Sequence, residues 1–138
     1  KGKITVLGGS QKRPNIHISD MADLYVRLVD EPDEKIIGQT FNAGGENYFI
    51  DAIALLVKIM VEDSRKLKII EIERKPTEDL RSYHISSEKI RKELGWKPKF
   101  NILDAIKGLI IAFENGKILN PDDPKYYNIK TMQKLNIS

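Results

Sequence analysis

The chain contains no cysteine. This absence excludes a disulfide framework, a thiol nucleophile and a cysteine-ligated zinc site, and it favours a reducing, cytoplasmic setting. Long hydrophobic runs are missing too, because a stretch such as residues 109–113 is far shorter than the roughly 20 apolar residues that a membrane span needs. We therefore expect a soluble protein with no membrane partner.

A strong excess of one charge is also absent. The 23 Lys and Arg residues and the 20 Asp and Glu residues leave a net charge of +3, which is too small and too evenly spread for nucleic-acid binding but would admit an anionic ligand. A length of 138 residues with 41% hydrophobic side chains suits one domain over residues 1–138. The first residue is lysine and a strand-like pattern follows at once, so we expect a piece of a longer protein.

Phosphate-binding loops are missing from the sequence. No Gly-x-Gly-x-x-Gly follows a strand pattern and no Walker loop is present, so the chain itself has no cradle for a dinucleotide or a triphosphate. The glycine pairs at 8–9 and 44–45 are interpreted as turns at the ends of strands.

Residues for catalysis or metal binding are scarce. His17 and His84 have no helical partner at i+4 and are interpreted as packed or hydrogen-bonded strand histidines. Tyr126 and Lys130 have the Tyr-x-x-x-Lys spacing that can lower the pKa of a phenol, but without a cofactor loop we interpret this match as coincidence. No catalytic, cofactor-binding or metal-binding residue is predicted.

Strand and helix patterns alternate along the chain. They predict an α/β fold, or α+β for the chain taken alone, with a small sheet and about four helices. Strands are expected at 4–7, 16–18, 40–43 and 67–72, with a short one inside 79–85, and helices are expected after Asp20, around 53–60, after Ser86 or Ser87, and after Asn101. Asp20 and Asn101 are predicted caps, and Gly95 is a predicted helix stop.

Three segments in a fixed order carry a family resemblance. Residues 13–22, 40–47 and 79–98 resemble, in turn, an Arg-to-His-x-x-Asp segment before a helix, a Tyr-Asn-Ile-Gly-Gly-like segment, and a segment that ends in Glu-Leu-Gly-Trp-Lys-Pro. In this order they are similar to the C-terminal half of the extended short-chain dehydrogenase/reductases, in the NAD-dependent epimerase/dehydratase family that acts on nucleotide sugars.

The resemblance implies a division of labour in the parent protein. In this family the N-terminal part binds NAD or NADP and carries the catalytic Ser/Thr and Tyr-x-x-x-Lys, whereas the C-terminal part holds the nucleotide diphosphate of the sugar. This chain resembles the second part only, so we expect it to be inactive alone, inside an isomerase- or lyase-type enzyme that is a homodimer. A strand at about 39–43 would join the missing Rossmann sheet.

The resemblance also implies four substrate-binding residues. Arg13 matches an arginine that contacts the diphosphate, and Lys75, with Arg74 beside it, matches the position of a second phosphate-binding arginine. Asn47 matches a substrate-contacting asparagine of the dehydratase branch. We expect Arg74 and Lys75 to face Arg13.

Two other functions stay open from the residues alone. The chain could be a stand-alone module that binds nucleotide sugars without NAD, or a structural or partner-binding domain that binds neither. Titration with nucleotide diphosphates separates the first from the second.

Overall fold

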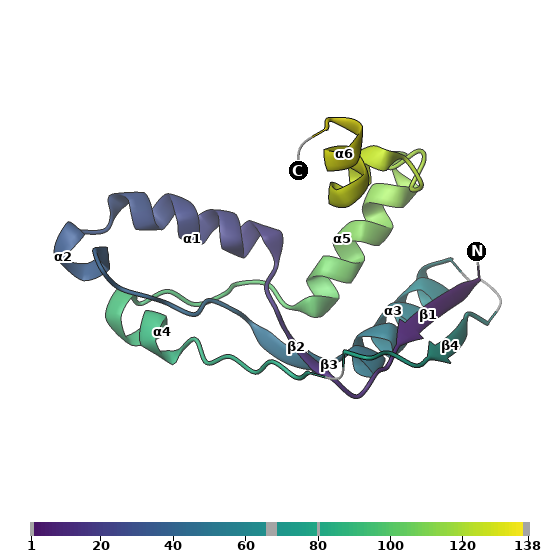
Figure 1. The fold of residues 1–138 in the computed structure, drawn as a ribbon, viewed down its shortest axis with the longest axis horizontal. Coiled ribbons are helices and arrows are strands. Elements are labelled where there is room, and N and C mark those ends of the chain that lie inside the picture. Colours follow the sequence, from purple (N-terminus) through teal and green to yellow (C-terminus); the bar gives the residue numbers. More distant parts are fainter. Residues whose placement is uncertain (1, 66–68, 80, 137–138) are drawn as a thin grey trace. The chain divides into compact units, whose positions relative to one another are not determined.

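The computed structural model describes residues 2–65, 69–79 and 81–136, and Figure 1 shows their path. Strands and helices alternate along the chain, so the predicted α/β class is confirmed. The chain divides into two compact units, Lys1–Lys107 and Gly108–Ser138. The described strands and the predicted binding residues all belong to the first unit. The assignment of residues 1–138 to one substrate-binding domain stays a prediction.

The first unit contains a parallel pair of strands. β1 (Lys3–Leu7) pairs with β4 (Glu71–Lys75), and Leu7 lies opposite Lys75. Helix α3 (Ile50–Arg65) contacts β1 and lies beside the pair in Figure 1. The strand predicted at 4–7 and the helix predicted around 53–60 are therefore confirmed.

The strand predicted at 67–72 is wrong in its position. Residues 67–68 lie outside the described residues, 69–70 are in no strand, and β4 begins at Glu71. The ladder starts there because β1, its partner, starts at the residue opposite, Lys3. The apolar pattern of residues 67–72 correctly predicted that Ile70 is buried, and this residue is 7% exposed. The pattern did not predict the register in which β4 pairs with β1.

A second, antiparallel pair was not predicted as such. β2 (Lys12–Asn15) pairs with β3 (Glu46–Phe49), and Arg13 lies opposite Tyr48. The strand predicted at 16–18 is wrong, because β2 ends before it and a helix begins within it. β3 contains too few apolar residues to give an alternating pattern, so only its pairing with β2 reveals it.

Helix α1 (Ile18–Asp30) begins differently from the prediction. Its cap is His17, whose Nδ1 accepts a backbone N–H of the first turn at 3.1 Å. Asp20 is only 1% exposed, and its carboxylate accepts the backbone N–H groups of Lys99 at 2.9 Å and of Phe100 at 3.0 Å. The cap prediction for Asp20 is wrong, because this carboxylate holds a segment about 80 residues away in sequence.

A small core lies between α1 and α4 (Glu88–Leu94). Its buried members are Leu24, Ile90, Leu94 and Trp96. Gly95 ends α4 with φ 63°, as predicted, because a left-handed residue at this place favours glycine. A short helix, α2 (Asp33–Ile36), follows α1.

The segment 39–43 forms no strand with any described residue. Phe41 and Ala43 are partly buried against the core of α1 and α4. A strand needs a neighbouring edge to complete its hydrogen bonds, and no such edge lies beside this segment in the described part of the chain. That the segment joins a sheet supplied by another part of the parent stays a prediction.

Helix α5 (Ile102–Glu114) begins as predicted. The Asn101 side-chain oxygen accepts the N–H of Leu103 at 2.8 Å and of Asp104 at 3.1 Å, so Asn101 is its cap. The second unit continues with a 3₁₀ turn, η1 (Pro124–Tyr126), and with α6 (Asn128–Lys134). Among the described residues, no helix is both long enough and apolar enough to cross a membrane.

Candidate functional site

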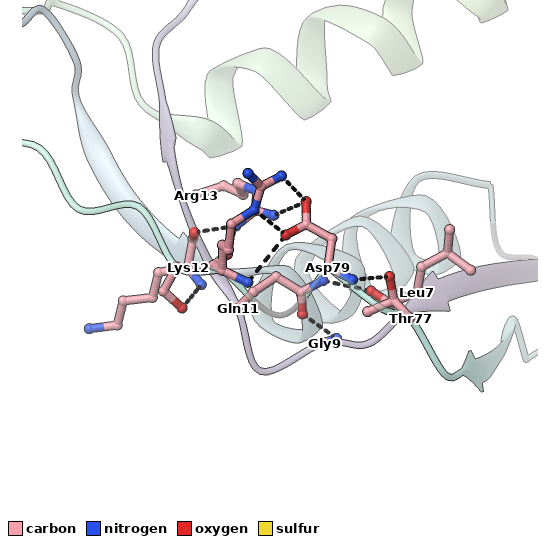
Figure 2. Close-up of polar contacts among 9 residues, drawn as sticks. Leu7, Gly9, Gln11, Lys12, Arg13, Thr77 and Asp79 are labelled. Carbon is pink, nitrogen blue, oxygen red and sulfur yellow. Dashed lines mark hydrogen bonds and ion pairs between the residues drawn. The ribbon is translucent and has the colours of Figure 1, made fainter.

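The turn between β1 and β2 is closed by a buried glutamine (Figure 2). The Gln11 side chain is inside the first unit, and its Oε1 accepts the N–H of Gly9 at 2.7 Å while its Nε2 donates to the Leu7 carbonyl at 2.8 Å. The Gly8 N–H donates to the carbonyl of Lys75 at 2.8 Å. These bonds fix the direction in which the chain enters β2 and thereby place Arg13.

Glycine is required at the tip of this turn. Gly9 has φ +122°, and a Cβ atom there would lie 2.6 to 2.7 Å from the carboxyl atoms of Asp51. The Asp51 N–H also donates to the Gly9 carbonyl at 3.0 Å, which joins the start of α3 to the turn. The interpretation of residues 8–9 as a turn agrees with this geometry.

Arg13 has a half-buried, firmly held guanidinium, with 28% of its side chain exposed. Its Nη1 donates to the carbonyls of Lys12, at 3.0 Å, and of Arg81. Its Nη2 lies 3.6 Å from a carboxyl oxygen of Asp79, and the group lies over the ring of Tyr83, 5.1 Å from the ring centre. Figure 2 shows the Arg13 and Asp79 side chains turned toward each other.

Asp79 is shared between two arginines. Arg81 donates to it through a fork, from Nε to Oδ1 at 2.8 Å and from Nη2 to Oδ2 at 3.1 Å. The hydrogen bonds from Arg81, more than the charge of Arg13, lower the pKa of Asp79 to about 2. The same carboxylate raises the pKa of Arg81 above its usual value. The carboxylate is therefore ionised at neutral pH and carries its charge between two cations.

The segment with these residues runs beside β2 without forming a strand. The Ser82 hydroxyl accepts the N–H of Lys12 at 3.0 Å, and the Tyr83 N–H donates to the carbonyl of Lys12 at 3.0 Å. The short strand predicted within 79–85 is not formed by residue 79 or by residues 81–85, because one backbone bond and one side-chain bond do not make a ladder. Leu80 lies outside the described residues. The sequence did hold a signal: Asp79, Arg81 and Tyr83 alternate, and alternate residues of an extended chain share a face.

Asn47, a predicted substrate contact, bonds to the chain itself. Its Oδ1 accepts the N–H of Ile85 at 3.1 Å, and its Nδ2 donates to the carbonyl of Ile85 at 3.1 Å. The side-chain amide of Asn47 thus bonds to both the backbone N–H and the backbone carbonyl of Ile85, as a residue of a neighbouring strand would. This pairing anchors the segment after Tyr83 to β3, and the contact of Asn47 with substrate stays a prediction.

Arg74 and Lys75 lie at the end of β4. The Arg74 Nε is 2.9 Å from an Asp51 carboxyl oxygen, and the Lys75 Nζ is 3.7 Å from Glu73. Both side chains are more than half exposed and line an open depression together with Gly8, Ser10, Asp51, Pro76 and Thr77. Among the described residues, the side-chain contacts of Arg13 outside β2 go to Asp79, Arg81 and Tyr83 and not to Arg74 or Lys75. That Arg74 and Lys75 face Arg13 stays a prediction.

The remaining polar motifs contribute no further site. The His17 ring packs on Phe100 with centroids 4.7 Å apart, so this histidine is packed and hydrogen-bonded as predicted, although at a helix cap and not in a strand. Within the described residues no cluster of His, Asp and Glu could hold a metal ion. Lys130 lies over the ring of Tyr127, 4.0 Å away, and not over Tyr126.

The glycine turn after β1 does not fit the pyrophosphate of a dinucleotide. This turn leads into another strand, β2, so no helix N-terminus follows it to receive a pyrophosphate.

Comparison with a family model supports the resemblance inferred from the sequence. Residues 1–44 match the model of the NAD dependent epimerase/dehydratase family. The chain is 32% identical over 98 residues to dTDP-glucose 4,6-dehydratase of Shigella flexneri, an alignment that covers 66% of this chain. The chain spans only 26% of the length of that relative. The predicted resemblance to this family is confirmed.

Solved structures show the same fold over most of the chain. L-threonine dehydrogenase from Phytophthora infestans is 16% identical with a TM-score of 0.69, and the match covers 83% of this chain and 37% of that one. dTDP-glucose 4,6-dehydratase from Bacillus anthracis, in complex with NAD, is 20% identical with a TM-score of 0.62, over 82% of this chain and 34% of that one. RMD from Pseudomonas aeruginosa, complexed with NADPH, is 20% identical with a TM-score of 0.64, and the match covers 83% of this chain and 36% of that one. At these identities the likeness concerns the fold.

Proposed function

We propose that this chain is the C-terminal substrate-binding part of an NAD-dependent nucleotide-sugar epimerase or dehydratase, and that it holds the nucleotide diphosphate of the substrate. The observation that carries the proposal is the Arg13 guanidinium. Two carbonyls fix its plane through Nη1, and Asp79 lies 3.6 Å from its Nη2. The Nε donor and one Nη2 hydrogen have no partner among the described residues.

A guanidinium with free donors in a fixed orientation suits a phosphate group. Arginine can donate two parallel hydrogen bonds to phosphate oxygens, and a held side chain loses less conformational freedom on binding. Binding the diphosphate, which does not react, would provide energy that orients the sugar toward catalytic groups elsewhere. The role of this chain would then be binding and orientation.

The chemical groups of the reaction belong, in this proposal, to the part of the parent outside this chain. The matched family and the NAD and NADPH complexes of two neighbours support a nicotinamide cofactor for that parent. The dehydratase relative supports a nucleotide-sugar substrate. The contacts of Arg74, Lys75 and Asn47 with substrate, the homodimer and the cytoplasmic setting stay predictions.

Calorimetric titration of the chain with uridine and thymidine diphosphates tests the proposal. Replacement of Arg13 by alanine should weaken binding by about 1.5 to 3 kcal/mol, the range for hydrogen bonds to charged groups. Arg91→Ala is a matched control, because it removes the same charge from an exposed residue of α4 that pairs with Glu88. Fluorescence of Trp96, the one tryptophan, reports whether each variant is folded.

Three results would separate the candidate functions. Binding that is lost in Arg13→Ala and kept in Arg91→Ala supports the proposal. Equal affinity of both variants contradicts the role of Arg13. No binding by the unaltered chain would favour a structural or partner-binding domain, for which Arg13 is silent in every assay of ligand binding.

A further inference from the structure

We propose that Arg81 supplies the second guanidinium of the anion site, and that Arg13 and Arg81 together bind the two phosphate groups of a nucleotide diphosphate beside the Tyr83 ring. This inference rests on the proposed function, from which it takes the ligand. The second phosphate-binding cation, expected at Lys75 or Arg74, would then be Arg81.

Both guanidiniums lie over one aromatic ring. The distance from the centre of the Tyr83 ring is 5.1 Å for Arg13 and 5.9 Å for Arg81. Cations are attracted to the face of an aromatic ring at such distances. The ring therefore brings two positive groups to the same place, although they come from a strand and from a separate extended segment.

An anionic group already lies within reach of both guanidiniums. The Asp79 carboxylate accepts the Arg81 fork at 2.8 and 3.1 Å and lies 3.6 Å from Arg13. A carboxylate is smaller than a diphosphate and bears one charge, so two guanidiniums and one carboxylate leave a local charge of +1. Asp79 is a positioning residue in this arrangement, because it orients both cations without removing their joint positive charge.

Donors remain free on both arginines. Asp79 takes the Nε and Nη2 edge of Arg81, so its Nη1 has no partner in the described part of the chain. Arg81 is 73% exposed at the side chain, and this free end is open to a ligand. Arg13 likewise keeps its Nε donor. Two oriented guanidiniums with free N–H groups suit a ligand with two adjacent phosphates.

The cations at the end of β4 are less suited to this role. The Nε of Arg74 lies 2.9 Å from a carboxyl oxygen of Asp51, so the positive charge of this arginine is balanced by one negative charge. Lys75 has a single ammonium group, which cannot fork to two phosphate oxygens. Neither contacts the group of Arg13, Asp79 and Tyr83 through the interactions of the described residues, whereas Arg81 contacts each of its members.

The test is calorimetric titration of the chain with uridine diphosphate and uridine monophosphate. Arg81→Ala should weaken diphosphate binding by about tenfold or more, and Arg81→Lys should weaken it by a smaller factor because the fork is lost and the charge is kept. The loss should be smaller for the monophosphate. Arg91→Ala, which removes an equal charge from α4, should stay within about twofold of the unaltered chain.

A double variant separates direct binding from an effect through Asp79. Without Arg81, the Asp79 carboxylate could turn to Arg13 and compete with the ligand. Asp79→Ala combined with Arg81→Ala removes that competitor, and we expect the affinity to stay low. Recovery to the unaltered affinity would overturn the direct role of Arg81.

The outcomes also separate this inference from the proposed function. If Arg13→Ala weakens binding and Arg81→Ala matches the Arg91→Ala control, Arg81 is no part of the site and the proposed function stands. If the unaltered chain does not bind uridine diphosphate, both are overturned. Because Arg81 is largely exposed, the Trp96 fluorescence of its variants should equal that of the unaltered chain.

Discussion

The buried carboxylate of Asp20 should contribute more to stability than any nearby surface charge. Asp20 is 1% exposed and accepts two backbone N–H groups, at 2.9 and 3.0 Å, from the segment that precedes α5. Asp23 is one turn further along the same helix, but its side chain is 42% exposed and pairs with the Lys99 ammonium at 2.9 Å. Replacement of aspartate by asparagine at these two positions therefore compares the same chemical change at a buried and at an exposed site.

The expected magnitude follows from the bonds that are lost. Asp20→Asn keeps one acceptor oxygen and turns an NH₂ group toward the other backbone donor, so one charge-assisted bond is lost and one N–H is left unsatisfied. This should cost about 2 to 3 kcal/mol in the free energy of unfolding. Asp23→Asn breaks an exposed ion pair and should cost less than about 1 kcal/mol.

Urea unfolding followed by Trp96 fluorescence measures both changes. Trp96 is 2% exposed and lies in the core between α1 and α4, so its emission reports on this region. With a slope of about 1.5 kcal/mol per molar urea, a loss of about 2 to 3 kcal/mol in Asp20→Asn should lower the midpoint by roughly 1.3 to 2 M. Equal midpoints for Asp20→Asn and Asp23→Asn would refute the reasoning, because burial would then make no difference to the value of the carboxylate.

Two further predictions concern the turn and the shared carboxylate. Gly9→Ala should cost about 1 to 3 kcal/mol in the free energy of thermal or urea unfolding, because φ is +122° and the new Cβ would clash with Asp51. Gly38→Ala is the control and should cost less, because φ is +71° and no atom lies within 4 Å of the new Cβ. A larger loss in Gly38→Ala than in Gly9→Ala would contradict the predicted clash with Asp51. The depressed pKa of Asp79, about 2, means that its contribution to stability is complete above its ordinary pKa of 3.8 and is lost as the pH falls toward 2. A carboxyl NMR titration should find the low pKa and a shift back toward 3.8 in Arg81→Gln; an unchanged pKa in that variant would show that Arg81 is not its cause.

Local sequence predicted the elements whose stability is local. The apolar spacing of α3 and α5, the Asn101 cap and the Gly95 stop each depend on residues within a few positions, and all four are found as predicted. Arg13 was found through a resemblance and is placed on β2. What its guanidinium contacts could not be read from its neighbours in sequence.

Contacts across long stretches of sequence decided the rest. Aspartate is a residue type that often caps helices, yet the Asp20 carboxylate accepts hydrogen bonds from the backbone N–H groups of Lys99 and Phe100. A carboxylate accepts bonds from whichever N–H groups the fold places beside it. Asp79 and Arg81 occur in a stretch for which the sequence predicts a short strand and a family resemblance, but no contact with Arg13. Tertiary structure brings both to Arg13, 66 and 68 positions earlier, because the Ser82 hydroxyl and the Tyr83 backbone N–H bond to the backbone of Lys12 in β2. Residue type and spacing thus determined the helices α3 and α5, the Asn101 cap, the Gly95 stop and the family resemblance. The partners of Asp20, Asp79 and Arg81 were set by the packing of distant segments.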